Sequence, residues 1–522
     1  MISQKIYLLS LFLAFAWNSG AVAQSPPVNG MRPSDVRWDA IEHATVFTSP
    51  LIKIDDATIL MRNGWIEAVG PTVNISIPAG ATIHNGRGKT VMAGFIEPAL
   101  ILNSAALAKK VAGDAGAHWN SNVTPQVSTK DLPPISAEVS QELRALGFTI
   151  AAAYPNSGIF RGSGAVVLLG MEPNGTRTIG GDAGQFVSFG RSPPDARSEN
   201  DDDMWRAPTY PNSTMGAVAL LRQTFLDARW RAKSVDVWNA HPTGNDPPIA
   251  AAALDAFAQA ISGNDRVLFD AATELDALRA GGLAQEFKLN ASILGGGGEF
   301  RNLNEIAAMK LPIIVPLDFP QPPDLSSPRL SESISLRDLE SWAVAPSNAA
   351  RLIAAGVPVS LTTSRLKQRD SFPARAREAR EAGLSEAQLI AALTTAPASL
   401  LGMSDTIGTI EKGRMANLTV SDGPLFAEDS RITEVWIAGR SYDAAAQDKT
   451  PFENDFVGAG RFSLTLADGS ARIVVIDAKK RTIVFEATAA DATKTSTSAS
   501  NISLDRLRGG FVVDGEALGM AG

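Results

Sequence analysis

Side chains able to bind a metal or carry acid–base chemistry are few and scattered in this 522-residue chain. It contains no cysteine and four histidines, His43, His84, His118 and His241. None of these histidines has a second one at the i,i+2 or i,i+4 spacing that places two imidazoles on one metal ion. A zinc site with ordinary nitrogen and sulfur ligands is therefore not expected, and we predict no bound cofactor.

Carboxylates within or after apolar runs are the other candidates for a site. Glu97, Asp270, Glu299 and Asp318 occupy such positions, and carboxylate oxygens are ligands that Mg²⁺ and Ca²⁺ accept. A metal held by these carboxylates therefore stays open as an alternative. The acidic run 199–203 lacks the glycine and the ligand spacing of a calcium loop, which favours a solvated stretch of charge.

Two other patterns do not indicate catalysis. The chain has no Gly-x-Ser-x-Gly sequence beside a credible histidine. The glycine run Gly295–Gly298 lacks both the Gly-Lys-Ser/Thr ending of a phosphate loop and the dinucleotide-binding spacing. We interpret it as a turn in which the backbone approaches another segment closely.

The hydrophobic pattern divides the chain into β-like flanks and an alternating middle. From 44 to 96 short apolar runs are separated by turns, and Asn63-Gly64 between two of them is a strong hairpin signal. After Gly94, strand-length apolar runs alternate with amphipathic stretches such as 215–233 and 275–289, which predicts a parallel sheet buried on both faces. The expected strands are 95–102, 149–154, 165–169, 266–269, 292–294, 313–317 and 357–361.

Two polar segments interrupt this alternation. Residues 103–136 and 171–213 are rich in Gly, Pro, Asn and Asp and are predicted to be long loops. Ser385 and Gln388 form a capping-box pattern at the start of a helix. From Ile407 the chain returns to short strands, and 448–522 holds too few of them to form a stable sheet without a partner.

Three stretches resemble the amidohydrolase superfamily in its imidazolonepropionase- and prolidase-like branch. They are 88–97 (GKTVMAGFIE), 391–402 (AALTTAPASLLG) and 407–418 (IGTIEKGRMANL), in the order in which the family has them. The resemblance implies an α/β fold with a (β/α)8 TIM-like barrel, a composite β-sandwich built from both flanks and a C-terminal β extension. The expected parts are a signal peptide at 1–23, sandwich strands at 24–90 and 401–447, the barrel at 91–400 and an incomplete β extension at 448–522.

The resemblance also implies where a metal centre would lie. In this family a divalent metal such as Zn²⁺ activates water to attack a C–N or C–O bond. The resemblance places metal-binding histidines at Ala99 and Ile101 after the first barrel strand and at Asp270 after a later one, and the catalytic Asp at Ser364. Because none of these four residues is the expected ligand, we predict that the metal site is degenerate and that catalysis is lost.

The first residues indicate export. Lys5 precedes an apolar run, Ile6–Trp17, that is shorter than the ~20 residues needed to span a bilayer, and Ala21-Val22-Ala23 is a cleavage pattern. We therefore expect a periplasmic or secreted protein with no membrane segment in its mature form. A net charge of −8 argues against nucleic-acid binding, which needs dense Lys/Arg patches.

Together these observations lead to the hypothesis of a non-catalytic amidohydrolase-like protein. The chain resembles the amino-terminal half of long two-barrel amidohydrolases, so its partner would be a catalytically competent amidohydrolase chain or a missing C-terminal half. Two alternatives stay open, because a fold alone does not define a function. One is an active hydrolase of C–N bonds with a carboxylate-held metal, and the other is a small-molecule binding module that uses the barrel mouth.

Overall fold

The computed structural model describes residues 36–171, 177–190, 210–323, 334–427 and 429–444, together with the backbone of several strands between 460 and 513. The expected signal peptide at 1–23 and the acidic run at 199–203 lie outside the described residues. Within the described part, no helix combines the length and the apolar character needed to cross a membrane.

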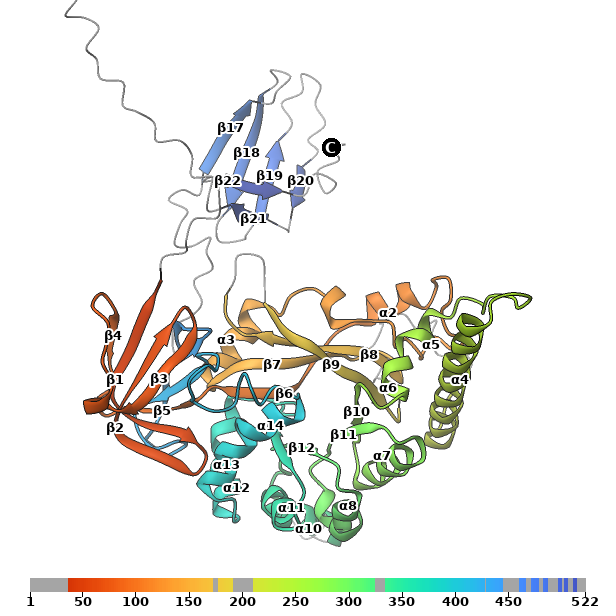
Figure 1. Ribbon diagram of the computed structural model, residues 1–522, viewed down its shortest axis with the longest axis horizontal. Helices are drawn as coiled ribbons and strands as arrows, with labels where there is room; N and C mark the ends of the chain where they lie inside the picture. The colour runs from red at the N-terminus through yellow and green to blue at the C-terminus, as the bar shows by residue number, and fades with distance from the viewer. Residues whose placement is uncertain are drawn as a thin grey trace, which may run out of the picture. The chain divides into compact units, whose positions relative to one another are not determined.

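One mixed sheet combines strands from the two flanks of the chain (Figure 1). The strands are β1 (Trp38–Ser49), β2 (Ile52–Arg62), β3 (Trp65–Pro71), β4 (Thr82–Asn85), β5 (Thr90–Ala93), β14 (Leu418–Ser421), β15 (Ile432–Ile437) and β16 (Arg440–Asp443). Their order is β16-β15-β14-β5-β1-β2-β3, and β4 pairs with β1. Asn63 and Gly64 join β2 to β3 with positive φ angles of 50° and 86°, which confirms the predicted hairpin.

A second, barrel-like sheet forms the centre of the molecule. Its strands are β6 (Phe95–Leu102), β7 (Phe148–Pro155), β8 (Phe160–Leu168), β9 (Thr178–Ser188), β10 (Arg266–Asp270), β11 (Asn290–Leu294), β12 (Ile313–Pro316) and β13 (Val359–Thr362), paired in this order. Neighbours run parallel except at β8, which is antiparallel to both β7 and β9. Every apolar run predicted as a strand overlaps one of these strands, so the mixed α/β class is confirmed.

Helices connect most consecutive strands of this sheet and lie along its outer side (Figure 1). The predicted helical stretches 215–233 and 275–289 correspond to α4 (Thr214–Ala240) and α7 (Glu274–Phe287). The Ser385–Gln388 capping box at the start of α13 is confirmed, with both reciprocal hydrogen bonds present. The helices are α2 (Ala105–Val111), α3 (Ala137–Ala145), α4 (Thr214–Ala240), α5 (Ala252–Ala256), α6 (Ala258–Ile261), α7 (Glu274–Phe287), α8 (Leu303–Met309), α10 (Leu336–Val344), α11 (Asn348–Ala354), α12 (Phe372–Glu381), α13 (Glu386–Leu393) and α14 (Thr395–Leu400).

The prediction of a regular (β/α)8 repeat is wrong at β8 and β9. Only residues 156–159 connect β7 to β8, whereas a parallel return needs about a dozen residues, so the chain turns back antiparallel. β9 lies inside 171–213, which we predicted to be a loop. Its sequence, TIGGDAGQFVS, has the glycine content of a loop, and it forms a strand here because β8 and β10 hydrogen-bond to its two edges.

The other predicted loop, 103–136, contains α2 and packs onto β8. The NH of Thr124 donates to the carbonyl of Phe160 at 2.9 Å, and the NH of Ser163 donates to the carbonyl of Val127 at 2.8 Å. At this crossing Gly162 has a φ of +115°, and a Cβ added to it would lie 2.1 Å from the Val127 carbonyl oxygen. The close approach therefore requires glycine.

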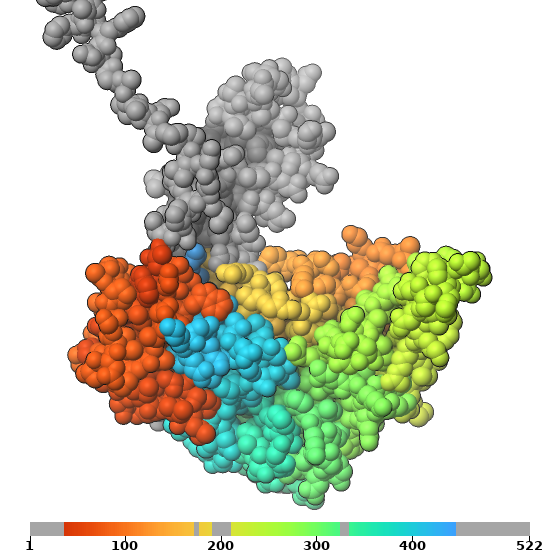
Figure 2. All heavy atoms as spheres, viewed as in Figure 1, coloured from red at the N-terminus to blue at the C-terminus, as the bar shows by residue number. Residues whose placement is uncertain are grey.

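The two sheets are joined by hydrogen bonds at the start of the barrel-like sheet. The NH of Gly94 donates to the carbonyl of Asn417 at 2.8 Å, and the hydroxyl of Thr419 on β14 donates to the carbonyl of Gly147 at 2.6 Å. On the face drawn in Figure 2, the N-terminal strands and the chain around residue 400 lie against each other. The sequence stretch 407–418 thus returns the chain from the barrel to the mixed sheet.

Residues beyond 459 add strands whose backbone alone is described. β17 (Gly460–Thr465), β18 (Ala471–Asp477), β19 (Thr482–Glu486) and β20 (Ser496–Ala499) form an antiparallel sheet in chain order. β21 (Ile502–Asp505) and β22 (Gly510–Val513) form a separate antiparallel pair.

Replacing Gly162 with Ala should lower the free energy of unfolding by more than about 2 kcal/mol, because the new Cβ overlaps the Val127 carbonyl and the φ angle is unfavourable for Ala. Gly282→Ala is the matched control. Its Cβ would face open space on the exposed side of α7 and should add up to about 1 kcal/mol. Thermal unfolding followed by circular dichroism measures the stability of both variants. Equal melting temperatures of the two variants would contradict the close approach of Val127 to Gly162.

Candidate functional site

The carboxylate of Glu97 lies fully buried between β6 and β13, the two ends of the barrel-like sheet. Its Oε1 accepts hydrogen bonds from the NH of Ala99, at 3.1 Å, and from the hydroxyl of Thr362. Its Oε2 accepts from the NH and the hydroxyl of Thr363, at 2.8 and 2.7 Å. No backbone ladder joins these two described strands, so the Glu97 side chain makes the link that nearly closes the barrel.

Burial raises the pKa of the Glu97 carboxyl, and the hydrogen bonds from Thr362, Thr363 and Ala99 oppose that rise. Every oxygen of this carboxylate is already engaged by donors of the chain itself. Of the predicted barrel-mouth carboxylates, Glu97 is therefore used to hold two strands together.

Two of the predicted ligand positions meet beside Glu97. The hydroxyl of Ser364 donates to the carbonyl of Ala99, and the NH of Ser364 donates to Oγ1 of Thr362 at 2.9 Å. Ala99 is fully buried, whereas Ile101 is half-buried two residues further along β6. The structure thus brings Ala99 and Ser364 together as the resemblance implies, but the contact between them is a hydrogen bond within the chain.

Asp270 ends β10 and pairs with two guanidinium groups. Nη1 of Arg161 on β8 lies 2.8 Å from Oδ2 of Asp270, and Nη2 of Arg365, just after β13, pairs with Oδ1. The Asp270 side chain is 19% exposed and that of Arg161 only 7%. Because two cations share one carboxylate, this cluster carries a net positive charge.

Arg161 is held in place by its surroundings as well as by Asp270. Its Nε donates to the carbonyl of Gly158 at 3.3 Å, and its guanidinium stands 4.7 Å from the ring centroid of Phe186. Burial lowers the pKa of Arg161, and the charge of Asp270 opposes the change. Arg365 has a left-handed φ of 70°, which is uncommon for a residue with a side chain.

Neither arginine was among the residues predicted from the sequence. Arg161 comes to the mouth because β8 runs antiparallel, so its first residues lie where the other strands end. The antiparallel direction of β8 follows from the short connection 156–159. This connection is the one sequence signal from which the position of Arg161 could have been predicted. Arg365 directly follows the predicted position Ser364.

Glu299 is buried and stabilises the glycine turn after β11. Its Oε1 accepts from the NH groups of Gly296 and Gly297 at 2.7 and 3.2 Å, and its Oε2 accepts from Nδ2 of Asn348 at 2.6 Å. A Cβ on Gly296 would lie 2.1 Å from the carbonyl oxygen of Ala272. The interpretation of Gly295–Gly298 as a close-approach turn is therefore confirmed.

Asp318, the last predicted carboxylate, is exposed beyond the end of β12, and no described residue forms an ion pair with it. Glu97, Asp270 and Glu299 thus bind separate partners. Among the residues that the structure describes, no three His, Cys, Asp or Glu side chains gather closely enough to hold a metal ion.

The four histidines lie in four different places. His43 pairs with Asp56 at 2.6 Å and His84 with Asp39 at 3.4 Å, both in the mixed sheet. His118 lies in the segment that packs on β8, where burial lowers its pKa, and His241 ends α4. No hydrogen bond or ion pair among the described residues joins a histidine to Glu97 or Asp270.

The residues at the mouth do not fit the divalent metal that the resemblance implies. A metal needs several lone pairs directed at one point. Here Ala99 and Ile101 offer no side-chain ligand, the Ser364 hydroxyl is bound to a carbonyl, and Asp270 is neutralised by two cations. The positive charge of Arg161 and Arg365 would also oppose a second cation.

Comparison with known protein families matches one part of the chain. The sequence profile of the Amidohydrolase family matches residues 344–448, which run from the end of α10 through β16. This segment of the chain is therefore similar to the Amidohydrolase family. Comparison with curated protein sequences gives no match.

Comparison with solved structures finds chains that are similar to this one. An amidohydrolase from Thermotoga maritima MSB8 is 22% identical with a TM-score of 0.60, over 78% of this chain and 100% of that chain. Molinate hydrolase is 15% identical with a TM-score of 0.45, over 80% of this chain and 96% of that chain. Phenylurea hydrolase B is 16% identical with a TM-score of 0.45, over 79% and 98%. The Thermotoga structure supports a common fold.

Glu97→Gln should lower the free energy of unfolding by roughly 1–3 kcal/mol, since the amide has one acceptor oxygen and leaves a buried backbone NH unpaired. Because folding raises the carboxyl pKa of Glu97, protonation of this group adds to the free energy of unfolding. The contribution is fully present below the ordinary pKa of 4.5 and is lost as the pH rises through the folded-state pKa. The difference between wild type and variant should therefore shrink with rising pH. Urea unfolding over a pH series tests this prediction, with Glu305→Gln at an exposed position as the control. If the free energies of unfolding of wild type and Glu97→Gln ran parallel across the pH series, the prediction would be wrong.

Asp270→Asn should cost about 3 kcal/mol of stability, because it leaves the buried guanidinium of Arg161 without its counter-charge. The control Asp318→Asn removes the same charge from an exposed position just after β12, two strands away from β10 in the sheet. It should change the free energy of unfolding by less than about 0.5 kcal/mol. Urea unfolding of the two variants compares them directly. An equal effect of both would show that the Arg–Asp–Arg cluster does not contribute to the fold.

Proposed function

We propose that this member of a hydrolase superfamily is a non-catalytic protein, with hydrogen bonds of its own chain in place of the metal ligands. The observation that carries the proposal is the contact between Ala99 and Ser364. These residues occupy the positions of a ligand and of the catalytic Asp in the resemblance, and the Ser364 hydroxyl donates to the Ala99 carbonyl. Water activation at this point would need an acceptor-rich site, which these residues do not form.

The charge at the mouth supports the same proposal. A hydrolytic metal centre places positive charge next to water by means of a cation held among carboxylates and imidazoles. In this chain Arg161 and Arg365 supply the positive charge, and their guanidiniums cannot take a proton from water at neutral pH. An active hydrolase with a carboxylate-held metal is disfavoured because Glu97, Asp270 and Glu299 each have other partners.

We further propose a partner and a location on the basis of the sequence. The resemblance to the amino-terminal half of two-barrel amidohydrolases supports association with an amidohydrolase chain, or a C-terminal half, that keeps the His-x-His ligands. The leader pattern at 1–23 supports a periplasmic or secreted location. The strands from both flanks in the mixed sheet support its assignment as the composite sandwich of the family.

A small-molecule binding module is the second candidate, and one observation favours it. The Arg161–Asp270–Arg365 cluster keeps one uncompensated positive charge, with Arg365 30% exposed. A guanidinium that retains free donors at a barrel mouth suits a carboxylate or phosphate group.

Metal analysis of the protein purified without chelators tests the proposal. We expect no stoichiometric Zn, Mn, Fe, Mg or Ca after gel filtration, and no rise in melting temperature on adding these ions. A triple variant is the matched comparison, and its metal content is measured in the same way. It restores the expected ligand types by the substitutions Ala99→His, Ile101→His and Ser364→Asp. Stoichiometric metal in the wild-type protein that is lost in Asp270→Asn would overturn the proposal.

A pull-down from the native host with the full-length tagged protein tests the partner. We expect mass spectrometry to identify an amidohydrolase chain with an intact His-x-His sequence. Failure to enrich such a chain, together with a ligand-dependent rise in melting temperature of the protein alone, would favour the binding module instead.

A further inference from the structure

The outer side of α4 carries a row of apolar side chains. Met215, Ala219, Leu226, Trp230 and Val237 follow one another at intervals of four or seven residues, which places them on one side of a helix. Leu226, Trp230 and Val237 are 52, 72 and 53% exposed. These five residues are called the α4 stripe below.

α4 packs on the barrel with its other side. Leu221, Phe225 and Ala228 are buried there, and the ring of Phe225 stacks on that of Phe257, between α5 and α6. Figure 1 shows α5 and α6 on the inner side of α4. A surface helix is expected to be polar on the side that faces solvent. Packing within a single chain therefore does not explain the α4 stripe.

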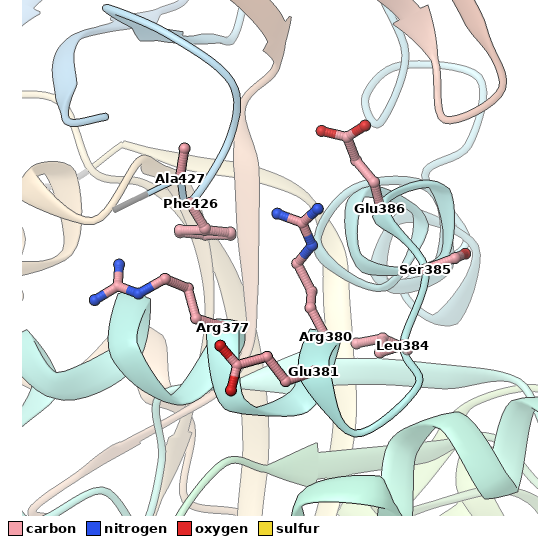
Figure 3. A pocket seen from close by; sticks show the side chains of 8 residues that line it. All are labelled: Arg377, Arg380, Glu381, Leu384, Ser385, Glu386, Phe426 and Ala427. Carbon is pink, nitrogen blue, oxygen red and sulfur yellow. The ribbon is translucent and has the colours of Figure 1, made fainter. Parts of the chain in front are cut away.

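The α4 stripe differs from the hollow of about 590 Å³ beside α12 and α13 (Figure 3). The lining of the hollow is largely charged, and Figure 3 shows its Arg377 and Arg380 pointing to different sides. Its two large apolar residues, Leu384 and Phe426, are only 2% and 5% exposed. A partner therefore finds little apolar surface in the hollow, whereas most of the α4 stripe is exposed.

The spacing within the α4 stripe matches a second copy of the same helix that runs in the opposite direction. Ala219 and Val237 lie nine residues before and after position 228, and Leu226 and Trp230 lie two residues before and after it. Two antiparallel α4 helices centred on this position place Ala219 of one copy against Val237 of the other, and Leu226 against Trp230. Each contact then occurs twice, as a two-fold symmetric interface requires.

The charges beside the α4 stripe favour the same arrangement. Arg222 and Asp236 lie on one flank of the stripe, and antiparallel packing brings this flank of both helices together. Arg222 of one copy then lies within about 3 Å of Asp236 of the other, measured along the helix axis. Asp236 is exposed and no described residue forms an ion pair with it, whereas Arg222 pairs through its Nε with Glu286. The terminal nitrogens of Arg222 therefore suit the carboxylate of Asp236 in the second copy.

We propose that α4 binds α4 of a second copy of this chain in an antiparallel, two-fold symmetric pair. Trp230 lies near the centre of the pair and packs on Leu226 of the other copy, which is the kind of position from which an aromatic residue dominates an interface. The contact from Ala219 to Val237 is about 27 Å long. An interface of this size is small, so we expect a dimer that dissociates in the micromolar range. The proposal does not depend on whether the mouth is catalytic.

Sedimentation equilibrium of the full chain tests the dimer, and we expect the average mass to rise from one chain to two as the concentration increases. Trp230→Ala should weaken association by at least roughly a hundredfold, because each dimer loses two central aromatic rings. Trp342→Ala on α10 is the control and should leave association unchanged. Both tryptophans are exposed, so neither variant should unfold the chain. A monomer at all concentrations up to about 200 μM, or a dimer of Trp230→Ala as tight as that of wild type, would overturn the proposal.

Disulfide cross-linking tests the antiparallel direction, because the chain has no cysteine of its own. The variants Ala219→Cys and Val237→Cys are oxidised separately and as a mixture. The antiparallel pair brings residue 219 of one copy to residue 237 of the other and holds identical residues roughly 27 Å apart, too far for a disulfide. We therefore expect a cross-linked dimer only in the mixture. Cross-links in each variant alone, or none in the mixture, would refute the antiparallel pair.

Discussion

The buried carboxylate of Glu97 joins the first and last strands of the barrel-like sheet, and the arrangement of the mouth depends on it. Both of its oxygens accept a backbone NH and a threonine hydroxyl, so the carboxylate replaces the ladder that β6 and β13 lack. An unpaired carboxylate at this depth would cost several kcal/mol, whereas four donors offset much of that desolvation. The same hydrogen bonds fix Ala99 and the residues after β13, where the resemblance would place metal ligands.

Closing the barrel in this way has a chemical consequence. A metal site requires lone pairs that converge on an empty point, and a strand-to-strand hydrogen-bond bridge requires donors and acceptors that satisfy each other. The carboxylate of Glu97 and the hydroxyl of Ser364 meet the second requirement and therefore cannot meet the first. The Arg161–Asp270–Arg365 cluster follows the same rule, since its carboxylate is already neutralised before any ion arrives.

Much of the fold could be predicted because the pattern of apolar residues in the sequence indicates directly which residues are buried. The strand runs between 95 and 361 and the Asn63-Gly64 hairpin depend on local sequence, and they are confirmed. β9 was missed because its glycine-rich sequence becomes a strand only when β8 and β10 bind its edges, which is a tertiary effect. Glu97 and Asp270 were found as residues, but their partners were not, since Arg161, Thr362 and Arg365 reach them from strands far away in the sequence.

The charged side chains at the mouth of the barrel are used within the chain itself. At the mouth, the buried Glu97 and Asp270 have partners within the chain, and this fits a structural role for that end. A ligand that reaches this end of the barrel therefore meets the two guanidiniums of Arg161 and Arg365 rather than a free carboxylate.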